Sequence, residues 1–249
     1  MLELKHISFS VMEETGQQKK ILKDINLTID TDTFVVITGP NGGGKSTLAK
    51  NIIKYINGDF EKPSQGTILF KGQDITNLDI HERAKLGMGF AFQQPVRFKG
   101  LTVRDLLHLS TSKQKSDQEL SQYLTEVGLN ASNYINREIN ASLSGGELKR
   151  IEIAMLMARG VDLSLFDEPE AGIDLWSFHN LIKVFEQIRD TKRGAVVIIS
   201  HQERILNIAD KIVVISNGEI DTVGTRDEIL PKLLSQSDTY QFHKVREQQ

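Results

Sequence analysis

A glycine-rich segment constrains the fold of this 249-residue chain more than any other feature. Residues 39–47 read Gly-Pro-Asn-Gly-Gly-Gly-Lys-Ser-Thr, so that four residues separate a glycine from Gly-Lys-Ser. The segment lies between a short apolar, β-branched run at Phe34–Thr38 and a helical pattern over Lys45–Ile56. A buried strand, a glycine-rich turn and a helix in this order predict a loop that wraps around phosphate groups.

The residue types of this loop suit a nucleotide. Glycines let the main chain approach phosphates closely, with several N–H groups pointing inward. We expect Lys45 to reach the β- and γ-phosphates and the hydroxyl of Ser46 to bind Mg²⁺. The alternative is a turn that merely joins strand to helix, which the flanking elements disfavour. The residues expected to contact the nucleotide are Gly39, Pro40, Asn41, Gly42, Gly43, Gly44, Lys45, Ser46 and Thr47.

Two acidic residues follow a second short strand candidate, Leu163–Phe166. A carboxylate beside the phosphate loop can hold Mg²⁺, and we assign that role to Asp167. Its neighbour Glu168 would polarise the attacking water. Taken alone, the pair is more simply two solvated acids at a strand end, because most acidic side chains are exposed.

Two further strand candidates end in polar residues with possible catalytic roles. Gln93 follows Met88–Phe92 and could contact Mg²⁺ or the attacking water. His201 comes shortly after Ala195–Ile199 and could donate a hydrogen bond to the γ-phosphate. A lone glutamine or histidine is more often structural, so neither residue carries the assignment by itself.

A second candidate anion site lies at Ser144, Gly145 and Gly146. These residues precede a helical pattern that runs through Leu156, and the N-terminus of a helix attracts anions. Glu147, three residues after Ser144, also completes a capping box. The segment can therefore be a helix cap, an anion site or both.

The order of the elements predicts an α/β fold, because strand candidates alternate with helical patterns. Residues 93–158 contain helical patterns and no good strand. We therefore expect a helical lobe inserted into a core made of residues 1–92 and 159–249, the whole chain of residues 1–249 forming a single domain.

The two ends of the chain carry simpler β signals. Leu2–Val11 and Ile21–Ile29 alternate apolar and polar residues, with the polar segment Glu13–Lys20 between them as a loop. Near the other end, Asn217-Gly218 joins two β-type runs and predicts a hairpin, since both turn residues need positive φ.

The composition narrows the possible surroundings and partners. The net charge of −3 does not suggest a global field for nucleic acid, although it leaves room for a local basic patch, and we expect no nucleic-acid partner. The chain has no cysteine, which suits a reducing cytoplasm and excludes thiolate sites. No apolar run approaches the roughly 20 residues that span a bilayer, and the N-terminus lacks a signal-peptide pattern. We expect a cytoplasmic protein without direct membrane insertion.

Taken together and in this order, the motifs resemble those of the ABC ATPase superfamily. The matching segments are a Walker A loop at Gly39–Thr47, a Q-loop at Gln93, a signature at Leu143–Glu147, a Walker B strand at Leu163–Glu168, a D-loop at Ala171–Asp174 and an H-switch at His201. The resemblance implies an ABC-type P-loop domain with a RecA-like core, an N-terminal antiparallel β region and an inserted helical lobe.

The same resemblance implies the chemistry. ATP and Mg²⁺ are the expected ligands, and the chain is expected to be an ATPase that releases ADP and phosphate. Glu168, His201 and Gln93 would be catalytic, and Ser46, Gln93 and Asp167 would contact the metal. Two chains would pair head to tail, each ATP lying between the Walker A loop of one subunit and the signature residues of the other.

Four stretches resemble the SufC-type branch, the ATPases of the SUF iron–sulfur cluster assembly system. They are Phe90–Val96, Ser144–Arg150, Asp167–Asp174 and Ser200–Leu206. This likeness implies a SufB/SufD-like scaffold protein as partner. The alternative is the cytosolic ATP-binding subunit of an ABC membrane transporter.

Two features of the expected ligand surfaces follow from the resemblance. Val11 stands where the family usually has an aromatic residue that stacks on adenine, so the resemblance implies loose selectivity for the base. The partner surface is expected between Gln93 and Leu109. There, Phe98, Leu101 and Leu106 would form either an apolar docking groove or ordinary core.

Overall fold

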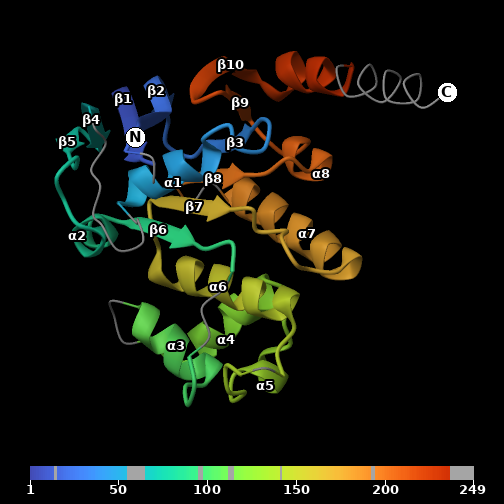
Figure 1. Cartoon of the computed structure of the whole chain (residues 1–249). Coiled ribbons are helices and arrows are strands. Elements are labelled where there is room, and N and C mark those ends of the chain that lie inside the picture. Colours follow the sequence, from blue (N-terminus) through green and yellow to red (C-terminus); the bar gives the residue numbers. More distant parts are fainter. Residues whose placement is uncertain are drawn as a thin grey trace.

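The computed structural model describes residues 1–13, 16–54, 65–94, 98–111, 115–140, 142–191 and 194–235. Two sheets form the upper part of the molecule, and a group of helices lies below them (Figure 1). The smaller sheet is antiparallel, with the strand order β2-β1-β4-β5. Its strands are β1 (Leu2–Met12), β2 (Gln18–Ile29), β4 (Gln65–Phe70) and β5 (Gln73–Asp74).

The larger sheet has the order β10-β9-β3-β8-β7-β6. All neighbours in it are parallel except β10, which pairs antiparallel with β9. Its strands are β3 (Phe34–Thr38), β6 (Met88–Ala91), β7 (Leu163–Asp167), β8 (Ala195–Ile199), β9 (Lys211–Ser216) and β10 (Glu219–Thr225). The predicted hairpin joins β9 to β10, with φ of 52° at Asn217 and 81° at Gly218.

The parallel sheet is buried on both faces, as apolar layers on each side require. Successive residues of β3 enter different cores: Val35 and Ile37 pack towards the small sheet and α1 (Lys45–Ile53), whereas Phe34 and Val36 pack towards the helices on the other face. This two-residue alternation places α1 between the two sheets, directly after the glycine-rich loop.

The remaining helices are α2 (Ile80–Lys85), α3 (Val103–Ser110), α4 (Asp117–Glu126), α5 (Ala131–Tyr134), α6 (Gly145–Arg159), α7 (Leu175–Thr191) and α8 (Glu203–Leu206), followed by a helical segment at residues 226–235. They lie mostly on the second face, except α2, whose Arg83 donates to carbonyls at the end of α1. In Figure 1, α6 lies between the large sheet and α3, α4 and α5. Thr102, Ser116 and Ser144 each close a capping box, which fixes where α3, α4 and α6 begin.

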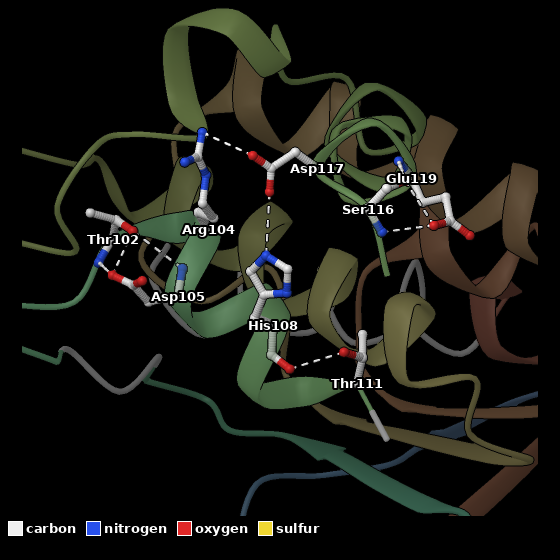
Figure 2. Close-up of polar contacts among 8 residues, drawn as sticks. All are labelled: Thr102, Arg104, Asp105, His108, Thr111, Ser116, Asp117 and Glu119. Carbon is white, nitrogen blue, oxygen red and sulfur yellow. Dashed lines mark hydrogen bonds and ion pairs between the residues drawn. The ribbon is translucent and has the colours of Figure 1, made fainter. Parts of the chain in front are cut away.

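A charged side chain fastens α3 to α4. Figure 2 shows Arg104 and His108 of α3 pointing towards Asp117, the first residue of α4. The carboxylate of Asp117 lies 3.3 Å from Nη2 of Arg104 and 3.3 Å from Nε2 of His108. These two contacts hold the first turn of α4 against α3.

The α/β fold with its antiparallel N-terminal region is confirmed, but some element boundaries were wrong. Lys54 adopts a left-handed conformation with φ of 55°, so α1 ends at Ile53, and residues 55 and 56 lie outside the described part. β2 begins at Gln18, inside the expected polar loop, because its exposed early residues still pair with β1. β6 ends at Ala91, one residue early.

Candidate active site

Four neighbouring strands bring the predicted site residues to one edge of the large sheet. In the order β3, β8, β7 and β6, the strands are parallel and end next to one another. They are followed by the glycine-rich loop, by His201, by Glu168 and by Gln93, respectively. The carboxyl edge of such a sheet is where α/β proteins bind ligands.

The glycine-rich loop is pressed against the end of β9. Gly39 has φ of 135°, and a Cβ atom there would lie 2.0 Å from the carbonyl oxygen of Ile215. The carbonyl of Gly43 accepts a hydrogen bond of 2.9 Å from the N–H of Gly218. Only glycine fits the first of these positions, and the close packing leaves the loop a fixed shape.

Lys45 is buried beneath this loop, with 5% of its surface exposed. Its Nζ donates hydrogen bonds of 2.9 Å to the carbonyl oxygens of both Gly39 and Pro40. Burial lowers the pKa of the amine, while the charges of Glu168 and Asp167 act in the opposite direction. A buried cation whose described hydrogen bonds all go to main-chain carbonyls is well suited to an anionic ligand such as a phosphate.

Ser46 and Asp167 form the predicted metal corner of the site. The hydroxyl of Ser46 donates to Oδ1 of Asp167 at 3.0 Å. Burial raises the pKa of Asp167, and this hydrogen bond partly offsets that rise. Within the described residues no group of three or more His, Asp or Glu side chains could hold a metal. One carboxylate and one hydroxyl fit Mg²⁺, which keeps waters and uses phosphate oxygens as further ligands.

Gln93 and Glu168 meet although 75 residues separate them. Nε2 of Gln93 donates to Oε2 of Glu168 at 2.7 Å. Glu168 has φ of 45°, a left-handed conformation that is costly for a residue with a side chain and is common at active sites. Its N–H donates to the carbonyl of Ile199 at 3.0 Å, so β8 supports the turn.

The structure does not bring His201 to these groups. The residue is exposed, and its Nε2 lies 3.4 Å from Nε2 of Gln202. The described contacts include none between His201 and Glu168 or Lys45. His201 therefore lies at the same sheet edge but outside the hydrogen-bonded cluster.

Ser144, Gly145 and Gly146 lie at the start of α6, away from the glycine-rich loop. The hydroxyl of Ser144 accepts a hydrogen bond from the N–H of Glu147 at 3.2 Å, and the Glu147 carboxylate accepts one from the N–H of Ser144 at 2.6 Å. A Cβ atom on Gly146 would lie 2.4 Å from Cβ of Ser177, so α6 packs tightly against the start of α7. The helix-cap interpretation is confirmed, and the two candidate anion sites have no described contact within one chain.

Comparison with known proteins decides the family. The ABC transporter family model matches residues 22–171. An uncharacterised ABC transporter ATP-binding protein of Methanocaldococcus jannaschii is 40% identical over 217 residues, which cover 85% of each chain. The chain belongs to the ABC transporter family. The probable ATP-dependent transporter ycf16 of Pyropia yezoensis is 34% identical over 90% of this chain and 91% of its own length.

Solved ABC cassettes share the fold. The ADP conformation of an ATP-binding cassette of an ABC transporter has a TM-score of 0.78 and 26% identity, covering 98% of both chains. A dimeric ATP-binding cassette bound to ADP and phosphate has a TM-score of 0.77 and 25% identity, covering 91% of this chain and 99% of its own. As a member of the ABC family, the chain is an ATPase whose ligands are ATP and Mg²⁺. No helix in the described residues is long and apolar enough to cross a membrane.

The ABC cassette also contains a groove of about 870 Å³ between α3, α6 and β6. Its lining includes Phe98, Leu101, Leu106 and Leu109. Phe98 and Leu109 are exposed, whereas Leu106 retains 5% of its surface. Leu106 therefore belongs to the core and also lines the groove, whereas docking of a partner at Phe98 and Leu101 stays a prediction.

Sequence reasoning missed four polar residues around this ABC site. Lys149 and Glu152 of α6 contact the main chain of Phe92, and the hydroxyl of Ser200 donates to Oε1 of Glu170. Each of the four is wholly or largely buried. The local sequence gives no signal for these residues, because their burial depends on partners that are distant in the chain.

Proposed function

We propose that the chain is the SufC-like ATP-binding and ATP-hydrolysing subunit of a SUF-type iron–sulfur cluster assembly complex. In this role it dimerises around ATP and drives a conformational change in a SufB/SufD-like scaffold. The observation that carries the hydrolytic part is the contact between Gln93 and Glu168 beside the Ser46–Asp167 pair. The family assigns the reaction, and these residues supply groups suited to it.

The residues of the site have different roles in the proposed reaction. The glycine-rich loop and Lys45 bind and orient the phosphates, Ser46 and Asp167 hold Mg²⁺ together with Gln93, and Glu168 takes a proton from the attacking water. Bound Mg²⁺ neutralises charge on the phosphate oxygens. His201 acts on the γ-phosphate after the loop that follows β8 moves towards it.

A head-to-tail dimer follows from the separation of the two anion sites. Ser144, Gly145 and Gly146 would bind the ATP held by the Walker A loop of a second chain. Leu175 and Trp176 are 71% and 81% exposed beside the D-loop residue Asp174, as expected of residues that a partner covers. The dimeric cassette with ADP and phosphate among the structural relatives is consistent with this arrangement.

The SUF assignment rests on the four stretches that resemble SufC-type ATPases. The ycf16 relatives, which are named probable ATP-dependent transporters, are 30–34% identical over about nine-tenths of both lengths and support the ATP-binding part of the proposal. Among the relatives named for transport, the sulfate/thiosulfate import protein CysA of Synechocystis is matched over 57% of its length and the lipopolysaccharide-export protein LptB of Haemophilus influenzae over 90%. The apolar groove lined by Phe98 and Leu101 would receive a helix of the scaffold.

The working units are the core of residues 1–92 and 159–249 and the lobe of residues 93–158. A SUF role places them in the cytoplasm, without nucleic acid and without insertion into a membrane. The lobe moves with the partner, and the core holds the phosphates. The groove lies where these two units meet, because its lining includes Leu86 and Val161 of the core and Leu106 of the lobe.

The second candidate function is the ATP-binding subunit of a membrane transporter, which the CysA and lipopolysaccharide-export relatives favour. Affinity purification of the tagged chain from native cytosol and from solubilised membranes, followed by mass spectrometry, separates the two. A soluble SufB- or SufD-like partner supports the SUF proposal. A multi-span membrane protein contradicts it and leaves the ATPase chemistry intact.

A further inference from the structure

Two charged side chains of α6 hold the chain as it leaves β6. The N–H of Phe92 donates to Oε1 of Glu152 at 3.2 Å, and Nζ of Lys149 donates to the carbonyl of Phe92. Lys149 and Glu152 are three residues apart on α6, and their charged groups lie 3.6 Å from each other. Both main-chain polar groups of the residue before Gln93 are therefore held by one face of one helix.

A contribution to overall stability is a weak explanation for this buried pair. The side chains of Lys149 and Glu152 are only 3% and 17% exposed. Burial lowers the pKa of Lys149 and raises that of Glu152, which is the mark of charges removed from water. A buried ion pair of this kind is often no more stabilising than apolar residues of similar size. The position of the pair against Phe92 points to a different role.

We propose that Lys149 and Glu152 are positioning residues for Gln93. The carbonyl that Lys149 holds belongs to the peptide bond between Phe92 and Gln93, so it fixes the point from which the Gln93 side chain extends. From that point Nε2 of Gln93 reaches Oε2 of Glu168 at 2.7 Å. The inference rests on the proposed roles of Gln93 and Glu168 in hydrolysis.

The clamp formed by Lys149 and Glu152 connects two other parts of the molecule. It belongs to the helix that begins at Ser144, so a ligand at the signature residues and the position of Gln93 are linked through one rigid element. Phe92 and Glu152 also line the groove beside α3. A partner helix in that groove would reach Gln93 through the same two side chains.

Three variants of α6 test the clamp. Glu152→Leu removes the acceptor while preserving approximate volume, Glu152→Gln keeps an acceptor oxygen, and Met155→Ala is the matched control. Met155 lies one turn further along α6 and lines the same groove. Hydrogen exchange of the peptide containing Phe92 and steady-state ATPase kinetics are measured on the full chain.

We expect Glu152→Leu to speed exchange at Phe92 and to lower kcat about tenfold, the effect of losing one hydrogen bond to a charged group. The ATP concentration for half-maximal rate should change little, because Lys45 and its loop are untouched. Glu152→Gln should keep most of the kcat of the unaltered chain, because it retains an acceptor oxygen. Met155→Ala should change neither the exchange rate at Phe92 nor kcat. Unchanged exchange in Glu152→Leu would overturn the inference, whatever the rate.

A double-mutant cycle with Gln93→Ala separates positioning from general structure. If the clamp acts through Gln93, Glu152→Leu has almost no further effect on kcat in the Gln93→Ala background. Lys149→Met should likewise have almost no effect on kcat in the Gln93→Ala background. It replaces Glu152→Leu in the cycle if that variant does not fold. Equal losses of rate in both backgrounds would overturn the proposal and leave the ATPase function standing. Failure of the unaltered chain to hydrolyse ATP would instead contradict the proposed function.

Discussion

Nε2 of Gln93 donates a hydrogen bond of 2.7 Å to Oε2 of Glu168, joining the ends of two parallel neighbours, β6 and β7. The bond orients a carboxylate that stands on a left-handed backbone at φ of 45°. Glu168 is therefore placed by its own turn and by a side chain from the next strand. A general base held in this way needs little rearrangement when the water to be activated arrives.

Replacing Gln93 by alanine should lower kcat about 100-fold, because misplacing a catalytic group by an ångström can cost that much. The Mg²⁺ concentration that gives half of the maximal rate should also rise, because the side-chain amide of Gln93 is a proposed metal contact. Phosphate release at varied Mg²⁺ measures both effects. Gln94→Ala is the control, being the next residue of the same type, and should change neither. A Gln93→Ala enzyme with normal rate and normal Mg²⁺ dependence would show that this bond has no part in hydrolysis.

Lys45→Ala should weaken ATP binding and abolish measurable hydrolysis. Nζ of Lys45 is already fixed by the carbonyls of Gly39 and Pro40, so its loss removes the preoriented cation of the phosphate site. Calorimetric titration with ATP and a phosphate-release assay provide the two readouts. Lys5→Ala, which alters an exposed lysine of β1, should bind and hydrolyse ATP normally. Normal turnover by Lys45→Ala would refute the phosphate-site assignment.

Two glycines of the loop should respond differently to alanine. At Gly39 the added Cβ would lie 2.0 Å from the carbonyl oxygen of Ile215, whereas at Gly42 nothing lies within 4 Å. Both positions have positive φ, so Gly42→Ala should cost about 1 kcal/mol of unfolding free energy from backbone strain alone.

Gly39→Ala adds the clash with Ile215 and should cost clearly more. Urea unfolding of the nucleotide-free protein measures both variants without relying on ATP binding. Equal losses for Gly39→Ala and Gly42→Ala would mean that the loop is not pressed against β9 as described.

Glu170→Gln should alter stability in a pH-dependent way. Burial raises the pKa of Glu170 above its ordinary value of 4.5, although the hydrogen bond from Ser200 opposes the shift. Between the ordinary and the raised pKa the folded chain binds more protons than the unfolded chain, so this carboxyl makes stability fall as pH rises through that window. Glutamine at this position does not titrate, so the variant lacks this pH-dependent contribution to stability.

The stability of Glu170→Gln relative to the unaltered chain should therefore increase from pH 4.5 to pH 8. Urea unfolding at both pH values tests this. Glu186→Gln, an exposed acid of α7, is the control and should show a smaller change. A difference that stays constant with pH would contradict the burial argument.

Strands β3 and β8 were predicted to the residue because each is a short apolar, β-branched run buried on both faces. In β3, Val35 and Val36 face opposite cores, so residues 34–37 are all apolar. Helix α7, by contrast, was not predicted. Its signal was present, since Phe178, Leu181, Phe185 and Ile188 recur at helical spacing after the capping side chain of Asp174.

The site residues could be predicted where a sequence motif specifies both the residue type and the strand or helix beside it. Ser46 and Asp167 are 121 residues apart, yet Ser46 lies in the first turn of α1 and Asp167 ends β7, and the structure joins them. Lys149 and Glu152 could not be found in this way. Their function depends on which strand lies over α6, and a lysine and a glutamate at that spacing ordinarily form an exposed pair on a helix.

The most direct test of the account is the oligomeric state of Glu168→Gln with and without Mg-ATP, measured by gel filtration with light scattering. The variant keeps the phosphate loop and the metal corner and lacks the general base. We expect it to hydrolyse ATP at least about 100-fold more slowly than the unaltered chain and to elute as a dimer only with Mg-ATP. A chain that stays monomeric with Mg-ATP, or that hydrolyses ATP normally with glutamine at this position, would contradict the account.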